Sequence, residues 1–125
     1  MTAVATAARS SLAGYLANVG GTVHAIAPPV PTPPCLVITA DSPWMTPGTV
    51  GGALRNELHL KVLIVVLDRD NAAAMAELED HVEGVLGALK GKAVIREVTP
   101  PASTDIGAQG SALVSEVRIT LNVKE

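Results

Sequence analysis

Hydrophobic residues recur along the chain with two periods, and each period predicts one kind of element. Near the start, apolar positions spaced by three or four predict a helix over residues 2–18. Its apolar face comprises Val4, Ala8, Leu12, Tyr15, Leu16 and Val19. The same spacing returns after Asp70, which suits a helix N-cap, and continues to Gly91. The apolar face of this second helix comprises Met75, Leu78, Val82, Val85, Leu86 and Leu89.

Alternation of apolar and polar residues predicts strands elsewhere, the longest over residues 54–67. One face of this strand comprises Leu54, Asn56, Leu58, Leu60, Val62, Ile64 and Val66, and the other begins with Arg55, Glu57, His59 and Lys61. After Lys61 both faces are apolar, so we expect this half to be covered on both sides. Shorter strands are expected at 22–26, 35–39 and 93–98. In a last strand Leu113, Val117, Ile119, Leu121 and Val123 face inward, and Glu116, Arg118, Thr120 and Asn122 face outward.

The predicted order of elements is α-β-β-β-α-β-β, with a polar loop at 99–110. This order indicates an α+β fold, a two-layer sandwich of a mostly antiparallel sheet with two helices. With 125 residues, the chain is expected to form a single domain, 1–125. The strand over 54–67 would be roughly 46 Å long, whereas a compact domain of this size is only about 36 Å across. We therefore predict a projecting hairpin that carries residues from about 38 to 58.

Residues 40–52, ADSPWMTPGTVGG, contain the only tryptophan of the chain. Their three glycines and two prolines predict a loop between two strands. An exposed tryptophan on a loop is costly unless something covers it. Either the indole of Trp44 folds back on its own domain, or it anchors in a neighbouring subunit. The length of the adjoining strand favours the interface.

Composition and charge exclude several classes of function. The net charge is −3 and the charges are well mixed, so we expect no dedicated nucleic-acid surface. Cys35, the only cysteine, lies in the apolar run CLVIT, where a buried inert thiol in a reducing compartment is expected. The three histidines fall on different predicted elements without zinc-ligand spacing. No apolar run reaches the ~18 residues that span a bilayer. We therefore expect no catalytic residue, cofactor, metal or membrane partner, and a chain that is cytoplasmic when made.

The proline-rich stretch PPVPTPP, Pro28–Pro34, predicts a stiff extended connection between two strands. A ligand for a proline-recognition domain is the alternative interpretation. GTVGG and GAQG lack the spacing and the lysine of phosphate-binding loops, so both are interpreted as turns.

With these features located, the chain resembles, nearly end to end, the tail-terminator proteins of long-tailed phages from GC-rich hosts. These are also called minor tail or head-to-tail joining proteins. The resemblance lies in a proline-rich crossover into an apolar strand, followed by the pattern D-x-P-W-M-x-P-G-T. That pattern is carried by Asp41, Pro43, Trp44, Pro47, Gly48 and Thr49. One departure is that TVGGALRNELHLKV has no aromatic residue, where the family's strand would show one.

The resemblance implies a ring of identical subunits, a homohexamer, that caps the completed tail tube and stops its polymerisation. It implies three partners: further copies of the chain, the major tail tube protein and the head connector or head-closure protein. The genome DNA would pass through the ring without specific binding, at the head-proximal end of the virion tail. The interface residues expected from this hypothesis are Asp41, Pro43, Trp44, Met45, Pro47, Gly48, Thr49, Arg55, Glu57 and His59.

Two other classes stay open. A head-closure or adaptor protein of the neck would share ring assembly but not position. A cytosolic ligand-binding α+β module would instead show a pocket with a few convergent polar groups. An enzyme ranks last.

Overall fold

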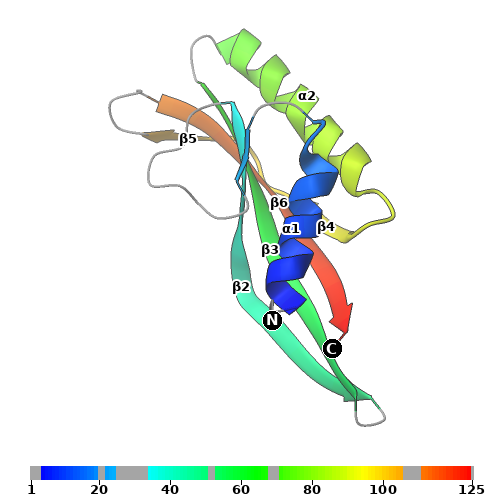
Figure 1. Ribbon diagram of the computed structural model, residues 1–125. Coiled ribbons are helices and arrows are strands. Elements are labelled where there is room, and N and C mark those ends of the chain that lie inside the picture. Colours follow the sequence, from blue (N-terminus) through cyan, green and yellow to red (C-terminus); the bar gives the residue numbers. More distant parts are fainter. Residues whose placement is uncertain are drawn as a thin grey trace.

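The computed structural model describes residues 4–19, 22–24, 34–50, 53–67, 71–105 and 111–124. Its elements, in chain order, are α1 (Val4–Leu16), β1 (Thr22–His24), β2 (Cys35–Val50), β3 (Ala53–Leu67), α2 (Asn71–Leu89), β4 (Val94–Val98), β5 (Ala102–Asp105) and β6 (Ser111–Lys124) (Figure 1). The predicted α+β fold and its order are confirmed. One short strand, β5, is added within the segment 99–110, which was expected to be a loop.

The sheet has six strands in the order β1-β2-β3-β6-β4, with β5 also paired to β6. Only β1 and β2 are parallel, and the other described pairs are antiparallel. The ladder between β2 and β3 continues to Val50↔Ala53, and the ladder between β3 and β6 continues to Arg55↔Lys124. As predicted, the β2–β3 hairpin extends past the helices (Figure 1). The end of β6 runs beside it for part of this length.

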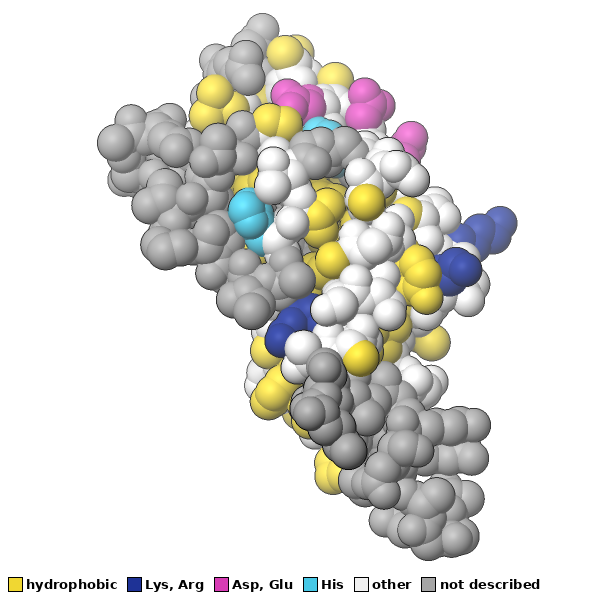
Figure 2. All heavy atoms as spheres, in the orientation of Figure 1, with side chains coloured by type: hydrophobic (Ala, Val, Ile, Leu, Met, Phe, Trp, Pro, Cys, Tyr) yellow, Lys and Arg dark blue, Asp and Glu magenta, His cyan; other side chains and the backbone are white. Residues whose placement is uncertain are grey.

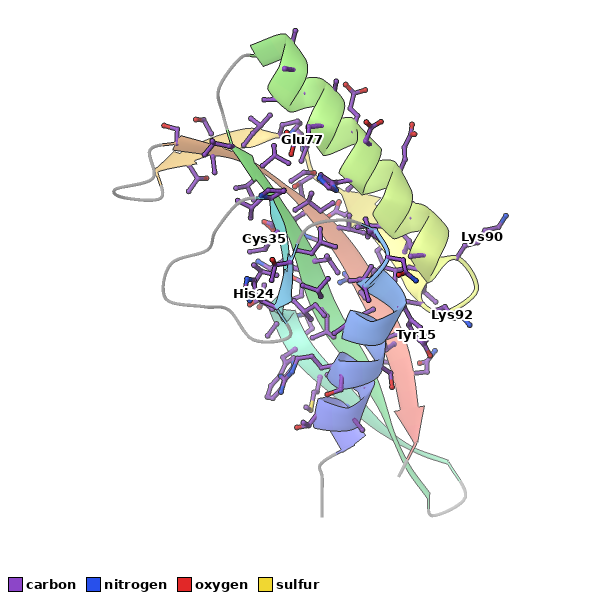
Figure 3. The ribbon with its side chains drawn as sticks, turned by 45° about the horizontal axis from the view of Figure 1, so that its top comes forward. Tyr15, His24, Cys35, Glu77, Lys90 and Lys92 are labelled. Atoms are coloured by element: carbon purple, nitrogen blue, oxygen red, sulfur yellow. The ribbon has the colours of Figure 1, made fainter. Side chains whose placement is uncertain are left out.

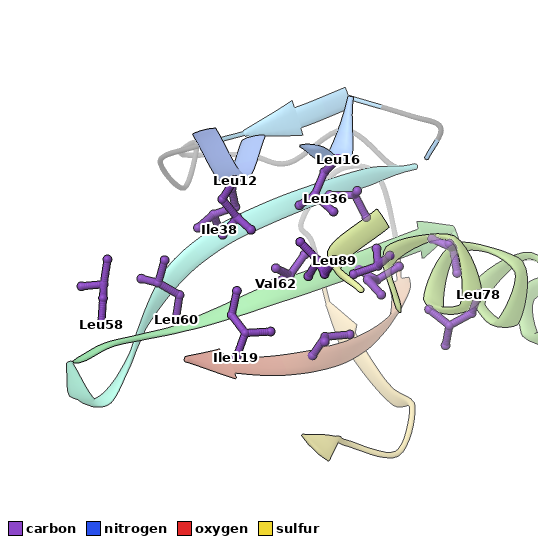
Figure 4. Close-up of a cluster of buried hydrophobic side chains, with 14 residues drawn as sticks. Leu12, Leu16, Leu36, Ile38, Leu58, Leu60, Val62, Leu78, Leu89 and Ile119 are labelled. Atoms are coloured by element: carbon purple, nitrogen blue, oxygen red, sulfur yellow. The ribbon is translucent and has the colours of Figure 1, made fainter. Parts of the chain in front are cut away.

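Both helices pack on one face of the sheet, which we call the helix-covered face. The alternation of β3 explains why, because every second residue from Leu58 to Val66 is buried on this side. The cluster they form (Figure 4) comprises Leu12, Leu16, Leu36, Ile38, Leu58, Leu60, Val62, Ile64, Val66, Leu78, Val85, Leu89, Val117 and Ile119. The inward-facing residues expected on β3 and β6 therefore form the main core.

A smaller cluster lies on the other side of the sheet, which we call the opposite face. It consists of Cys35, Val37, Val65 and Ala112, all buried. These residues lie toward the end of the sheet away from the hairpin tip. The prediction that β3 is covered on both sides beyond Lys61 therefore holds at Val65, whereas Leu63 and Leu67 on the same face are only partly buried. Burial raises the pKa of the Cys35 thiol, because the thiolate would lose its hydration. Cys35 is therefore buried as expected, and a raised pKa makes its thiol less reactive.

Two residues assigned to the apolar helix faces are exposed instead. Tyr15 is 42% exposed, because Leu12 and Leu16 occupy the side of α1 that meets the core. The Lys92 ammonium lies 5.1 Å from the centre of the Tyr15 ring, a cation–π arrangement (Figure 3). Met75, in the first turns of α2, is 37% exposed. Among the described side chains, the helical period therefore predicted the buried faces of the two helices correctly except at Tyr15 and Met75.

The prediction that residues 40–52 form a loop is wrong for residues 40–50, which belong to β2. Prolines are tolerated there because β1 pairs with β2 only up to Val37, so the rest of β2 has no described strand on its outer side. Gly91 follows α2 with a φ of 78°, and Leu89 accepts the Lys92 N–H, which ends the helix as expected. The Asp70 N-cap and the stiffness of the Pro28–Pro34 stretch lie outside the described residues, apart from Pro34.

Candidate interaction surface

A wide bulge interrupts the pairing of β2 with β3. Ala40 pairs with Leu60 and Met45 pairs with Leu58, so residues 41–44 stand opposite His59 alone. The bulge includes a cis peptide bond between Ser42 and Pro43. Extra residues on one strand leave the ladder and redirect their side chains. The sequence DSPW is therefore a bulge within a strand.

The bulge directs neighbouring side chains in different directions. Met45 is half-buried and packs against the main core. Trp44, the residue before it, is 46% exposed, and Pro43 and Pro47 are exposed as well. The indole of Trp44 therefore has nearly half of its surface uncovered. It lies at the bulge and not at the tip of the hairpin.

Asp41 is held at the start of the bulge. Its side chain is only 8% exposed, and its carboxylate lies 2.7 Å from the Arg96 guanidinium and accepts the Ser42 N–H at 2.8 Å. Burial acts to raise the pKa of Asp41, but the Ser42 N–H and the positive charges of Arg96 and Arg118 outweigh it, so the pKa is lowered. Arg96 also donates to the Ile119 carbonyl at 3.4 Å. The ion pair thus ties β4 to the bulge of β2.

Arg96 reaches this position because β4 has its own irregularity. Ile95 pairs with Ile119 and Glu97 pairs with Arg118, so Arg96 is an extra residue between them. The role of Arg96 was not predicted, although the sequence carries a signal for it. Arg96 and Glu97 are two consecutive polar residues in the strand AVIREV, and such a break in alternation is typical of a bulge.

His59 links three strands behind the bulge. Its Nδ1 lies 3.1 Å from the Thr120 hydroxyl of β6, and its Nε2 lies 3.1 Å from the Thr46 hydroxyl of β2. The side chain is 13% exposed, with the Glu57 carboxylate 3.8 Å away. His59 was expected at an interface, and in the isolated chain it is a mostly buried, hydrogen-bonded residue. Its two threonine partners were not predicted.

The remaining predicted interface residues lie further along the hairpin. Gly48 pairs with Arg55 and Thr49 pairs with Leu54, so these residues form the ladder toward the tip. The side chains of Thr49 and Arg55 lie outside what the structure describes. The Glu57 side chain is 55% exposed. The ten predicted residues therefore share one hairpin, but Asp41, Met45 and His59 are largely turned inward.

The opposite face next to the bulge is polar and connected. Lys61 lies 3.5 Å from Glu116, and Arg118 lies 2.7 Å from Glu97. Lys61, Glu116 and Arg118 were expected to face outward, and antiparallel pairing brings their strands together. Among the described residues, no group of three or more His, Cys, Asp or Glu side chains is arranged to hold a metal ion. The charged side chains of this surface are therefore mostly paired with one another.

A groove of about 300 Å³ lies between α2 and β4. Its walls are mostly apolar and include the exposed side chains of Met75 and Val98, which are 37% and 39% exposed. Glu79 and Glu83 also line it. The groove was not predicted, because it forms only where the exposed Met75 end of the apolar face of α2 meets β4, which is distant from it in sequence.

A solved structure matches the fold of the whole chain. The chain matches no protein-family model and no curated protein. It does match a chain in a solved structure of the virion of a native gene transfer agent particle, with a TM-score of 0.59 and 15% identity over 100% of both chains. The two chains therefore share a fold from end to end. Among the described helices, none is both long and apolar enough to cross a membrane.

Proposed function

We propose that the protein is a structural virion protein that assembles into a homo-oligomeric ring, a hexamer, on the tail tube. In this proposal the ring caps the completed tube, stops its polymerisation and forms the surface that joins the head connector. Its partners are further copies of itself, the major tail tube protein and the head connector or head-closure protein. Its place is the head-proximal end of the virion tail, and it needs no cofactor.

The observation that carries the proposal is the full-length match in fold to a chain of a gene transfer agent virion. The shared fold extends over 100% of both chains, so the likeness is not confined to one part of the chain. The bulge adds a second support. Trp44 is a large apolar side chain held 46% exposed on an ordered strand, and tryptophan is enriched where proteins meet.

The charge distribution fits a ring through which DNA passes without being held. The exposed side of α2 carries Glu77, Glu79, Asp80 and Glu83, and Figure 2 shows acidic side chains gathered over this helix. Lys90 and Lys92 lie beyond its C-terminal end, away from the acids (Figure 3). Strong retention of DNA needs many phosphate contacts from clustered basic residues. The nine Lys and Arg residues are mixed with twelve Asp and Glu residues along the chain and form no continuous basic run.

Electron microscopy of the purified protein, alone and with tail tubes, tests the proposal. We expect six-fold rings at one end of each tube. Rings that bind isolated connectors and ignore tubes would place the protein in the neck as an adaptor and refute the capping role. A chain that stays monomeric in the presence of both tubes and connectors would refute the ring itself.

Trp44→Ala and Tyr15→Ala form a matched pair for the same question. Both remove an exposed aromatic ring, 46% exposed in one case and 42% in the other. We expect Trp44→Ala to remain folded and to weaken ring formation in sedimentation velocity, whereas Tyr15→Ala assembles like the unmodified protein. Equal assembly of both variants would contradict an interface at the bulge.

A further inference from the structure

From the groove between α2 and β4 we infer where the exposed indole goes: the Trp44 side chain of one copy docks in the groove of the next copy. This inference rests on the proposed ring and adds the acceptor surface to it. It makes the interface a contact between two different patches of the same chain.

The chemistry of the groove suits an apolar guest. Its hydroxyl groups are already bonded, because the Ser115 hydroxyl donates to the Thr99 carbonyl at 2.7 Å and the Thr99 hydroxyl accepts the Glu116 N–H at 3.0 Å. A site for a small polar ligand would instead present convergent polar groups without partners. Met75 and Val98 stay exposed in its walls, where a hydrophobic group would cover them.

The size and charge of the groove match an indole. A volume of about 300 Å³ exceeds the ~150 Å³ of a cavity that accepts benzene. The only polar atom of tryptophan is its N–H, which is a donor. Glu79 and Glu83 supply carboxylate acceptors at the groove, and none of the residues described as lining it is basic. The indole of Trp44 is thus an apolar ring with one hydrogen-bond donor, and the groove is an apolar surface with hydrogen-bond acceptors.

The positions of the two patches make the contact head-to-tail. Trp44 lies on β2, whereas the groove lies beside β4, and β3 and β6 separate these strands in the sheet. Each copy therefore gives one indole to a neighbour and receives one from another. Repeated contacts between two different patches build a closed ring when the rotation permits.

The area of this contact also predicts how assembly behaves. With 46% of Trp44 exposed, the indole offers roughly 115 Å² from a side chain that buries up to ~250 Å². A stable pairwise interface buries ~800 Å² on each partner. One indole supplies a small part of that area, so isolated pairs are weak. Ring closure, which gives every copy two contacts, makes assembly cooperative.

Trp44 is the only tryptophan, so its fluorescence reports the contact without any substitution. We expect acrylamide quenching of Trp44 to fall severalfold, and its emission to shift to shorter wavelength, at the concentrations where sedimentation detects rings. Rings whose Trp44 stays as quenchable as in the free chain would overturn the docking inference and leave the proposed function standing. If no rings form on tubes, both proposals fail.

Val98→Lys and Val94→Lys provide the matched variants. Both place a charge on β4, but Val98 lines the groove and Val94, 56% exposed, does not. We expect Val98→Lys to weaken ring formation at least tenfold and Val94→Lys to leave it unchanged. Equal assembly of the two variants would refute the groove as the acceptor.

A cross-linking test covers the case in which Val98→Lys does not fold. Ser42→Cys beside Trp44 is mixed with Pro101→Cys in the groove, and Cys35 does not compete because it is buried. We expect a short bismaleimide to join the two variants into mixed dimers, and to give few dimers of either variant alone. Cross-linking of Ser42→Cys mainly to itself would indicate a symmetric contact and refute the inference.

Discussion

The ion pair between Asp41 and Arg96 allows a controlled measurement of what burial adds to a salt bridge. A second pair, Glu97 with Arg118, has the same N–O distance of 2.7 Å. The arginines are equally exposed, at 37% and 36%, whereas Asp41 is 8% exposed and Glu97 is 54% exposed. The two pairs therefore differ in the burial of the carboxylate and in the further hydrogen bonds of Asp41 to the Ser42 N–H and of Arg96 to the Ile119 carbonyl.

The expected coupling energies follow from that difference. Unit charges about 4 Å apart attract each other by about 4 kcal/mol at an effective dielectric constant of ~20, and desolvation of the carboxylate offsets part of this. Because Arg96 is also partly exposed to solvent, we expect about 2 kcal/mol between Asp41 and Arg96. The pair between Glu97 and Arg118 is a surface salt bridge, for which ~0.2–1 kcal/mol is typical.

Two double-mutant cycles measured by urea denaturation at neutral pH give these energies. One cycle uses Asp41→Asn with Arg96→Met, and the other uses Glu97→Gln with Arg118→Met. Methionine retains most of the apolar stem of arginine, so the charge is the main change. A coupling for Asp41 and Arg96 no larger than that for the exposed pair would show that burial at the bulge adds nothing, and the proposed anchoring of the bulge would be wrong.

Three further predictions concern stability. The pKa of Asp41 is lower in the folded than in the unfolded chain, so the stabilisation that Asp41 contributes is present above pH ~4 and is lost as the pH falls through the folded pKa. When the free energy of unfolding is measured at decreasing pH, Asp41→Asn should therefore lose less stability than the unmodified protein. In α2, Gly84→Ala should destabilise the fold because a Cβ there would lie 2.9 Å from a Val19 methyl group. At Gly87 an added Cβ meets no atom within 4 Å, so Gly87→Ala should stabilise the helix by up to ~1 kcal/mol. Thermal melts that rank the two variants the other way would contradict the packing of α2 on Val19. Leu60→Ala removes a side chain that is 2% exposed and should lower the free energy of unfolding by ~2–5 kcal/mol in urea titrations, and a loss below 1 kcal/mol would mean that β3 is not the centre of the core.

The central sheet could be predicted from the sequence because burial acts on every second residue of a strand. The alternation from Leu58 to Val66 identified the helix-covered face, and the apolar positions after Lys61 identified the second cluster. These patterns are local, so they need no knowledge of which strands pair. The order of the elements followed for the same reason.

The candidate surface could not be predicted in detail because its contacts join residues far apart in sequence. Arg96 and Asp41 are 55 positions apart, and His59 and Thr120 are 61 apart. Both contacts depend on the register that brings β2, β3, β6 and β4 into one sheet. The bulge also hides in the sequence, because proline and glycine are more common in loops than in strands. Trp44 is exposed as predicted, but it lies in a strand and not in the predicted loop.

The outer side of β2 has a consequence for solubility. Past the short pairing with β1, this strand would be a template for another chain if its N–H and C=O groups formed a regular row. Pro43 and Pro47 have no N–H to offer, and the distortion at residues 41–44 breaks the spacing of the row. The two prolines and the bulge thus oppose amyloid-like pairing of this strand with other chains, in a chain that is 48% hydrophobic. A second chain that packs against this edge would have to make its contacts through side chains and not through a continued backbone ladder.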